Sequence, residues 1–278
     1  ANVAALRIND VLKTKVSVTD PENPVLPAED VKGIVEFDHV SFAYPEAGEN
    51  VLTDISFKAE KGETIAVIGS TGSGKSTLVN LIPRFYDVTK GRILVDGVDV
   101  RDMTQKDVRS RLGYVPQKGI LFSGTIDSNI RYGKTDISVE EVKEAAEVAQ
   151  ATEFIDAKPE TYDSPISQGG TNVSGGQKQR LSIARAIAKK PEIFIFDDSF
   201  SALDFKTDST LRKALKAHTK DATTIIVAQR ISTILNADKI IVLDDGHMAG
   251  IGTHKELMKN CEVYRQIAMS QLSEEELA

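Results

Sequence analysis

The amino-acid sequence predicts an α/β fold with a mixed, mostly parallel β-sheet at its core. Strand-like apolar runs alternate with helical segments, most regularly after residue 190, and this alternation is typical of a parallel sheet covered by helices on both faces. One apolar run, residues 64–68, leads into a glycine-rich loop and then into a helical pattern. Between the early and late strands the pattern changes to helix, which predicts an inserted α-helical subdomain at about residues 118–185.

The N-terminal 32 residues are expected to lie outside the main domain. Residues 1–12 carry apolar side chains at loosely helical spacing, which predicts a short amphipathic helix. Residues 20–27 contain three prolines, which exclude both a helix and a central strand, so we interpret this stretch as a linker. The main domain is therefore expected to span residues 33–278.

Within the main domain, the elements follow from apolar patterning and turn residues. Strands are predicted at residues 34–42, 51–59, 64–68, 90–97, 111–115, 192–196, 223–227, 239–243 and 246–252. Helices are predicted from residue 77, at residues 138–149, 177–189, 208–218 and 231–235, and from residue 255 onward, with a solvated tail at 273–276. The helix at 138–149 has the clearest start, because Ser138 and Glu141 form a capping-box pattern.

The glycine-rich loop is the strongest chemical signal in the chain. The phosphate-binding pattern G-x-x-x-x-G-K-[ST] is matched by Gly69-Ser70-Thr71-Gly72-Ser73-Gly74-Lys75-Ser76. Its glycines allow successive backbone N–H groups to point inward around phosphate oxygens, and the helix that follows at Thr77 adds its positive N-terminal dipole. Lys75 is expected to reach the β- and γ-phosphates of a nucleotide, and the Ser76 hydroxyl to bind Mg²⁺.

A single acid completes the predicted metal site. Asp197 follows the apolar strand at residues 192–196, and an acid at the end of such a strand is the usual partner of a phosphate-binding loop. Its carboxylate is expected to hold Mg²⁺, directly or through water, beside the Ser76 hydroxyl.

The composition bounds the class of protein. With 27% charged and 41% hydrophobic residues it is typical of a globular chain. A net charge of −7 argues against nucleic acid as a partner, because a phosphate backbone requires a basic face. The single cysteine, Cys261, excludes an internal disulfide. No apolar run reaches the roughly 20 residues that a membrane-spanning helix needs, and the N-terminus has no signal-peptide pattern.

A second glycine motif lies ahead of Asp197. The stretch Val173-Ser174-Gly175-Gly176-Gln177 resembles Leu-Ser-Gly-Gly-Gln, the signature sequence of the ATP-binding cassette (ABC) family. Here too a hydroxyl, two glycines and a helix N-terminus are arranged to face an anion. The resemblance implies a P-loop NTPase fold of the ABC type with an antiparallel β subdomain, and ATP and Mg²⁺ as cofactors. It also implies that the signature caps the γ-phosphate held by a second subunit.

Three further residues match the family in chain order. Tyr44 matches the aromatic residue that stacks on adenine. Gln117 matches the glutamine that approaches Mg²⁺ and links the nucleotide site to the helical subdomain. Asp204, at the end of Ser201-Ala202-Leu203-Asp204, matches the loop that contacts the opposite site across a dimer. The resemblance covers the chain from Gly33 to the C-terminus.

Residues 121–126 (Leu-Phe-Ser-Gly-Thr-Ile) resemble the exporter branch of the family. In that branch the nucleotide-binding domain follows its own transmembrane domain on the same chain. The resemblance therefore implies that residues 1–32 are the linker and the end of a helix from a missing transmembrane domain. It also implies a place at the cytoplasmic face of the cell membrane, with that domain and a second nucleotide-binding domain as partners.

Two positions that act in the chemical step depart from the family pattern. The family normally has Glu after the Mg²⁺ acid to polarise the attacking water, and here Asp198 sets its carboxylate on the order of 1 Å further back, which can cost about 10²-fold in rate. Gln229 replaces the switch histidine, and it can hydrogen-bond a γ-phosphate but cannot carry charge or a proton. We therefore expect ATP hydrolysis to be slow at this chain's own site, where the catalytic residues are Asp198, Gln229, Gln117 and Lys75. The intact signature is then expected to complete the active site of a different partner chain, as in heterodimeric exporters, which include multidrug transporters.

Other readings remain open. The alternative is a catalytically competent nucleotide-binding domain of a homodimeric exporter. A chromosome-maintenance or repair ATPase is disfavoured, because such proteins separate the two glycine motifs by a long coiled coil. A soluble regulatory cassette protein usually carries two cassettes, and a GTPase needs an Asn-Lys-x-Asp motif that the sequence lacks. The sequence does not indicate a transported substrate.

Overall fold

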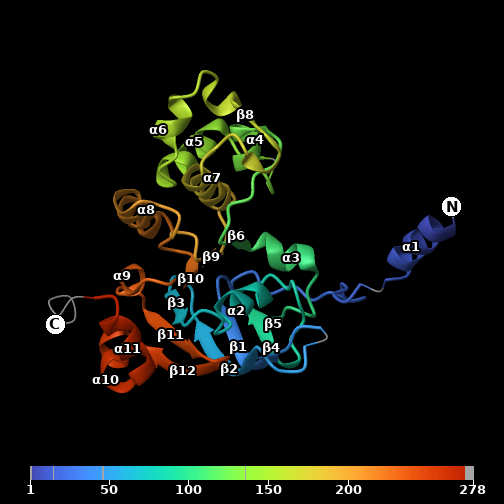
Figure 1. The fold of residues 1–278 in the computed structure, drawn as a ribbon, viewed down its shortest axis with the longest axis vertical. Helices are drawn as coiled ribbons and strands as arrows, with labels where there is room; N and C mark the ends of the chain where they lie inside the picture. Colours follow the sequence, from blue (N-terminus) through green and yellow to red (C-terminus); the bar gives the residue numbers. More distant parts are fainter. Residues whose placement is uncertain (1, 15, 46, 135, 273–278) are drawn as a thin grey trace.

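The computed structural model describes residues 2–14, 16–45, 47–134 and 136–272 (Figure 1). Two β-sheets and their covering helices form a core body, a group of helices lies above it, and α1 (Asn2–Lys13) lies apart from both (Figure 1). The predicted N-terminal helix is thus confirmed over its described residues. The predicted tail at 273–276 lies outside the described residues, as does Ala1.

A six-stranded sheet forms the centre of the core body. Its strands are β3 (Thr64–Gly69), β6 (Leu112–Val115), β9 (Ile193–Asp197), β10 (Thr223–Val227), β11 (Lys239–Asp244) and β12 (His247–Gly252). They lie in the order β12-β11-β3-β10-β9-β6, and all neighbouring pairs are parallel except β11 with β12. The mixed, mostly parallel sheet predicted from the sequence is therefore confirmed. Its central strands are nearly continuous apolar runs because both faces are buried.

A four-stranded antiparallel sheet packs beside the first. It consists of β1 (Val35–Phe42), β2 (Leu52–Ala59), β4 (Lys90–Val95) and β5 (Val98–Asp99), in the order β2-β1-β4-β5. The pairing of β1 with β4 is irregular between Asp38 and Ser41, opposite Gly91. Gly91 has a φ of 74°, and a Cβ atom there would lie 2.3 Å from the carbonyl oxygen of His39, so only glycine fits this bulge. This sheet is the expected antiparallel β subdomain.

Helices cover both faces of the six-stranded sheet. They are α2 (Lys75–Leu81), α8 (Phe205–His218), α9 (Ile231–Ile234), α10 (His254–Asn260) and α11 (Glu262–Met269). Ile65 and Val67 of β3 join the apolar cluster that contains α2 and the antiparallel sheet, whereas Ala66 and Ile68 join the cluster that contains α9, α10 and α11. The alternation of side chains along β3 thus divides the core into two layers of packing.

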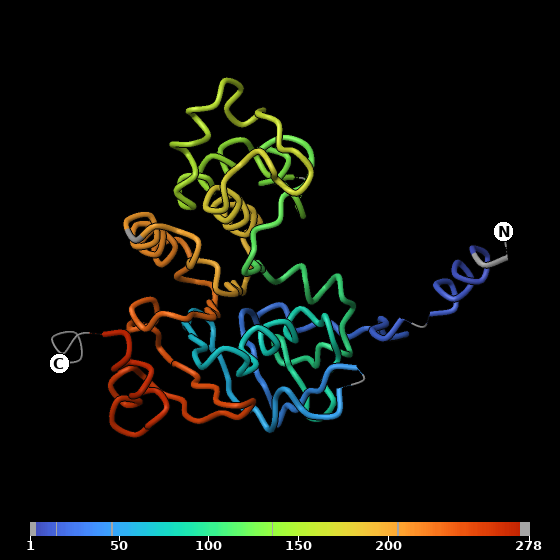
Figure 2. The backbone as a smooth tube through the Cα atoms, in the orientation of Figure 1, coloured from blue at the N-terminus to red at the C-terminus, as the bar shows by residue number. Residues whose placement is uncertain are grey.

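The helical group shares one apolar cluster with β6, β9 and α8 of the core body. It consists of α4 (Ile126–Ile130), α5 (Val139–Val148), α6 (Thr152–Asp156), α7 (Gly175–Ala188), the short turns η1 (Thr161–Asp163) and η2 (Gln168–Gly170), and the strand pair β7 (Gly124–Thr125) and β8 (Pro165–Ile166). The chain passes between this group and the core body at two places, after β6 and before β9 (Figure 2). Because β6 and β9 are parallel neighbours, the chain leaves the core body at the carboxyl end of β6 and returns at the opposite edge of the sheet, where β9 begins.

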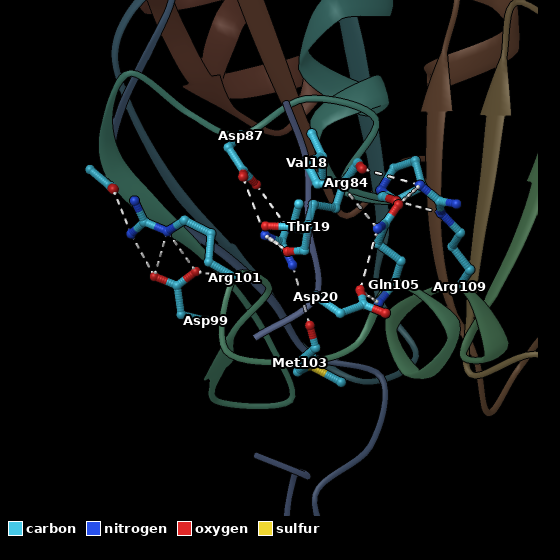
Figure 3. A network of polar contacts seen from close by, with 12 residues as sticks. Val18, Thr19, Asp20, Arg84, Asp87, Asp99, Arg101, Met103, Gln105 and Arg109 are labelled. Carbon is cyan, nitrogen blue, oxygen red and sulfur yellow. Dashed lines mark hydrogen bonds and ion pairs between the residues drawn. The ribbon is translucent and has the colours of Figure 1, made fainter. Parts of the chain in front are cut away.

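The proline-rich segment has no regular secondary structure, as predicted, but it is bonded to the core body (Figure 3). The Arg84 guanidinium, 4% exposed, donates to the Thr19 carbonyl at 3.0 Å and pairs with Asp87 at 2.7 Å. The Asp20 carboxylate accepts the backbone N–H of Gln105, which opens α3 (Gln105–Ser110), at 2.8 Å. These bonds connect the segment to the end of α2 and the start of α3.

Candidate nucleotide-binding site

Three parallel strands end at one edge of the six-stranded sheet and bring the predicted site residues together. β3 ends in the glycine-rich loop, β9 ends in the acids Asp197 and Asp198, and β10 leads to Gln229. Ligands in α/β proteins bind at the carboxyl ends of parallel strands, and this is the edge at which the three segments meet.

The glycine-rich loop has the curled backbone expected of a phosphate-binding loop. Gly72 and Gly74 have φ values of 87° and 95°, in the left-handed region that favours glycine. A Cβ atom on Gly74 would lie 2.8 Å from Leu52 Cδ2 and 3.0 Å from the carbonyl oxygen of Val51, so a larger residue would displace the loop from β2. Directly after Gly74, α2 begins with N–H groups that point to this loop.

Lys75 lies folded over the loop that it is predicted to serve. Its Nζ donates to the carbonyl oxygens of Gly69 at 2.9 Å and Ser70 at 2.6 Å. Burial lowers the pKa of the Lys75 ammonium, and the nearby charges of Asp198 and Asp197 act in the opposite direction. The Lys75 ammonium is thus held at the loop by two neutral carbonyl oxygens. Phosphate oxygens carry negative charge, so a bound nucleotide would attract the ammonium more strongly than these carbonyls do.

The two predicted metal ligands are in direct contact. The Ser76 hydroxyl donates to Asp197 Oδ1 at 2.9 Å, which joins the start of α2 to the end of β9. Burial raises the pKa of Asp197, so a cation beside this carboxylate would favour its ionised form. In the described part of the chain no cluster of three His, Cys, Asp or Glu side chains forms a protein-only metal cage. One carboxylate and one hydroxyl fit Mg²⁺, which is usually held with water and substrate phosphates.

Asp198 is the centre of a small polar network. Its Oδ2 accepts a hydrogen bond from Gln229 Nε2 at 2.6 Å and another from Gln117 Nε2 at 3.2 Å. Asp198 is 8% exposed and has a φ of 46°, a conformation that is uncommon for residues other than glycine and that is often found at functional sites. The residues predicted to act at the γ-phosphate therefore converge on one carboxylate.

Tyr44 lies beside the start of α2. Its hydroxyl is 2.9 Å from the Thr77 hydroxyl, and its ring packs edge-on against Phe42 and Tyr86, with ring centroids 4.9 Å and 5.2 Å away. This fixes the ring next to the phosphate-binding loop. Stacking of the ring on adenine stays a prediction.

The signature motif forms the N-terminus of α7, in the helical group and apart from α2 (Figure 1). The Ser174 hydroxyl accepts the N–H of Gln177 at 3.2 Å, and the Gln177 side chain accepts the N–H of Ser174 at 3.1 Å. This capping box starts the helix at Gly175, two residues before the prediction. Asp204 caps α8 in the same way, through the N–H of Thr207 at 2.9 Å. Both motifs are thus exposed helix starts.

Two contacts at the site have no signal in the sequence. The Tyr114 hydroxyl donates to Asn80 on α2 at 2.7 Å, and burial raises the pKa of this phenol. Gln271, beyond α11, hydrogen-bonds the backbone on both sides of Arg230, next to Gln229. Such a contact depends on how the end of the chain folds back, and no local pattern encodes that.

Fold and site together define a phosphate-loop nucleotide-binding domain. Comparison with protein-family models matches residues 52–201 to the family described as ABC transporter. The match covers more than half of the chain, and the chain belongs to this family. Domains of this family in general bind and hydrolyse ATP with Mg²⁺.

The chain is similar to proteins that are about twice its length. It is 47% identical, over 98% of its length and 47% of the relative, to an uncharacterized ABC transporter ATP-binding protein of Mycobacterium tuberculosis (strain ATCC 25618 / H37Rv). It is 46% identical, over 94% of its length and 45% of the relative, to a candidate multidrug export ATP-binding/permease protein of Bacillus subtilis (strain 168). The chain therefore spans about half the length of the curated relatives it matches.

A solved structure is similar over nearly the whole chain. The structure of a bacterial Atm1-family ABC exporter with ATP bound matches with a TM-score of 0.91 and 38% identity, over 98% of this chain and 47% of that chain. No helix in the described ranges is both long and apolar enough to cross a membrane.

Proposed function

We propose that this chain is the nucleotide-binding domain of a membrane exporter, in which binding of Mg-ATP drives pairing with a second nucleotide-binding domain and powers export. The family membership and the likeness to an exporter with ATP bound support this proposal. The transmembrane domain is then the part of the relatives that this chain does not cover. The domain works at the cytoplasmic face of the cell membrane.

In this proposal the chain's own site hydrolyses ATP slowly. The observation that supports this most is the state of the Asp198 carboxylate, whose Oδ2 already accepts two amide donors. Only Oδ1 remains to polarise a water, and the Asp side chain is one methylene shorter than the Glu of the family pattern. Gln229 is a neutral amide and accepts no proton from that water. The site is thus suited to holding ATP more than to cleaving it.

The signature is assigned to a partner's nucleotide. Ser174 and Gly175 are exposed at the start of a 14-residue helix, so N–H groups and a positive helix end are accessible to a phosphate from another subunit. Asp204 is exposed at the start of α8. An intact signature beside a weak catalytic carboxylate favours a pair of two different chains, in which the faster site is the partner's.

Substitutions at position 198 test this proposal. We expect the purified chain to bind Mg-ATP and to release phosphate slowly. In the full pair, Asp198→Glu should raise the rate only if the partner's signature permits it, since the longer side chain returns the carboxylate to the water by about 1 Å. The measurement is nucleotide binding together with phosphate release, and Asp221→Glu, at an exposed loop position, is the matched control. The double variant Asp198→Glu with Gln229→His separates the two departures from the family pattern.

Rapid turnover by the unmodified chain, abolished by Asp198→Asn, would contradict a slow site. That result would instead favour the competent domain of a homodimeric exporter. A chain that binds no ATP at all would contradict the proposed function itself.

A further inference from the structure

The last described turn of the chain lies against the switch segment. α11 ends at Met269, and the chain then turns so that the N–H groups of Gln271 and Leu272 both donate to the carbonyl oxygen of Ala268, at 3.0 Å and 2.9 Å. Tyr264 and Ala268 are fully buried, which fixes α11 to the core body, and Leu272 packs against the same apolar cluster. The position of Gln271 is therefore set by a folded helix.

The Gln271 side chain makes two hydrogen bonds to the backbone of the switch segment. Its Nε2 donates to the carbonyl oxygen of Gln229 at 2.9 Å, and its Oε1 accepts the N–H of Ile231 at 2.8 Å. The two groups flank Arg230, which is the N-cap residue of α9 but does not cap that helix with its own side chain. Gln271 thus satisfies one of the free N–H groups at the start of α9 and binds the segment as a neighbouring strand would.

This contact lies one residue from the catalytic network. The Gln229 whose carbonyl oxygen is bound by Gln271 donates through its side chain to Asp198 at 2.6 Å. Asp198, Gln229 and Gln271 also line one cavity of about 420 Å³. A shift of the backbone at residue 229 would therefore move the Gln229 side-chain amide relative to the Asp198 carboxylate. It would also move this amide relative to the γ-phosphate of a bound nucleotide.

We propose that Gln271 is a positioning residue, which holds the switch segment so that the Gln229 side chain faces Asp198 and the γ-phosphate. The inference rests on the proposed function, because it assigns the segment a role in ATP hydrolysis. It makes the turn after α11 part of the nucleotide site, although the turn is far from the glycine-rich loop along the chain. Loss of both bonds leaves the fold intact and frees the segment to sample other conformations.

The test replaces Gln271 in the full-length protein that contains this chain, purified without a different partner chain so that ATP turnover reports this chain's own site. Gln271→Met keeps the length of the side chain and loses both hydrogen bonds. Gln266→Met is the control, because Gln266 lies on α11 and its side chain bonds only to Glu262, at 3.1 Å, among the described contacts. We expect amide hydrogen exchange of residues 228–234 to accelerate by about tenfold or more, in line with two lost hydrogen bonds of ordinary strength. We expect kcat for Mg-ATP to fall by about tenfold while KM changes less than about twofold, because the geometry of the reacting groups is disturbed and binding is not.

The outcomes are distinguishable. Unchanged exchange in Gln271→Met would show that the contact does not hold the segment, and faster exchange with unchanged kcat would show that the segment's position does not matter for the reaction; either result overturns the proposal. An unmodified protein without ATP turnover contradicts the proposed function, and with it the catalytic part of this inference, before any variant is made. If Gln266→Met changed hydrogen exchange and kcat as much as Gln271→Met does, the cause would be a general disturbance of α11, and the proposal would be overturned as well.

Discussion

At the scale of single residues, burial shifts the pKa values of two charged groups of the site. Lys75 is the ammonium expected to meet the nucleotide phosphates, and burial has already lowered its pKa. Asp197 has a raised pKa for the same reason, so both groups are held in environments that disfavour their charges. A nucleotide with Mg²⁺ would supply the opposite charge to each of them at once.

The lowered pKa of Lys75 predicts that ATP affinity falls in the alkaline range. Phosphate oxygens favour the ammonium form, so the pKa of Lys75 is higher in the complex than in the free protein, and binding takes up a proton between those two pKa values. As pH rises through that interval, which begins below the ordinary lysine value of 10.5, the Kd increases by up to about tenfold per pH unit. Equilibrium binding of a fluorescent ATP analogue from pH 7.5 upward would measure this.

Two variants serve as controls for that titration. Lys75→Arg stays charged throughout and should bind with a flatter pH dependence, whatever its absolute affinity. Lys58→Arg, at an exposed lysine on β2, should retain the slope of the unmodified protein. A Lys75→Arg variant with an unchanged slope would assign the alkaline loss to another group.

At the scale of elements, the sequence predicted the long, strongly patterned segments and also the short β6 and α9, but it missed three other short helices. β10 was predicted with the bounds that it has, because its apolar run is sharply delimited. α3, α4 and α6 were missed since helices of five or six residues are too short to show helical periodicity. The Thr104 hydroxyl that caps α3, through the N–H of Asp107, was a readable signal for the first of these.

The residues of the candidate site also fall into those that the sequence predicts and those that it does not. Its residues on the glycine-rich loop and at the end of β9 were predictable, because backbone curling and strand direction are local properties. The sharing of Asp198 by Gln117 and Gln229 was not, because the two amides are far apart along the chain and meet only through the order of the strands. Neither was the contact of Gln271, which needs the whole C-terminal fold.

Arg84 joins three elements, and its loss is expected to destabilise the core body. Arg84→Met removes a buried guanidinium that bonds Asp87 and the carbonyl oxygens of Met103 and Thr19. We expect a loss of about 2 kcal/mol in the free energy of unfolding, below the range for fully buried pairs because Asp87 is partly exposed. Denaturant unfolding measures the change. Arg92→Met, which removes a guanidinium that is 56% exposed, should change stability by less than about 0.5 kcal/mol, and equal losses in the two variants would contradict the argument.

At the scale of the whole molecule, the nucleotide loop and the signature belong to different bodies. The loop lies in the core body, and α7 starts in the helical group, which the chain enters after β6 and leaves before β9 (Figure 2). A single copy thus presents two half-sites on separate surfaces. Pairing with another domain of the same architecture is the arrangement that we propose to bring each half to its complement.

The separation predicts that a signature variant affects the partner's site and spares this one. In the assembled pair, Ser174→Arg should lower total ATP turnover by about tenfold or more, because a bulky cation replaces the hydroxyl at the helix start that we propose faces the partner's γ-phosphate. Binding of Mg-ATP to the isolated chain should change less than about twofold. Ser138→Arg is the matched control, since it loses the same kind of capping box, from α5 in the same helical group. A comparable fall of ATP turnover in Ser138→Arg would show that the effect comes from lost helix stability and not from the signature.

The bonds of the proline-rich segment decide where this chain can be cut. A fragment that begins at residue 33, the expected start of the main domain, would strip the Thr19 carbonyl from Arg84 and the Asp20 carboxylate from the start of α3 (Figure 3). Val25 also donates its N–H to the Asp102 carbonyl at 2.8 Å. Prolines usually mark where a chain is safely divided, but here they belong to the part that must stay attached. The smallest fragment that keeps every one of these bonds begins at Val18, whose carbonyl accepts from Gln105.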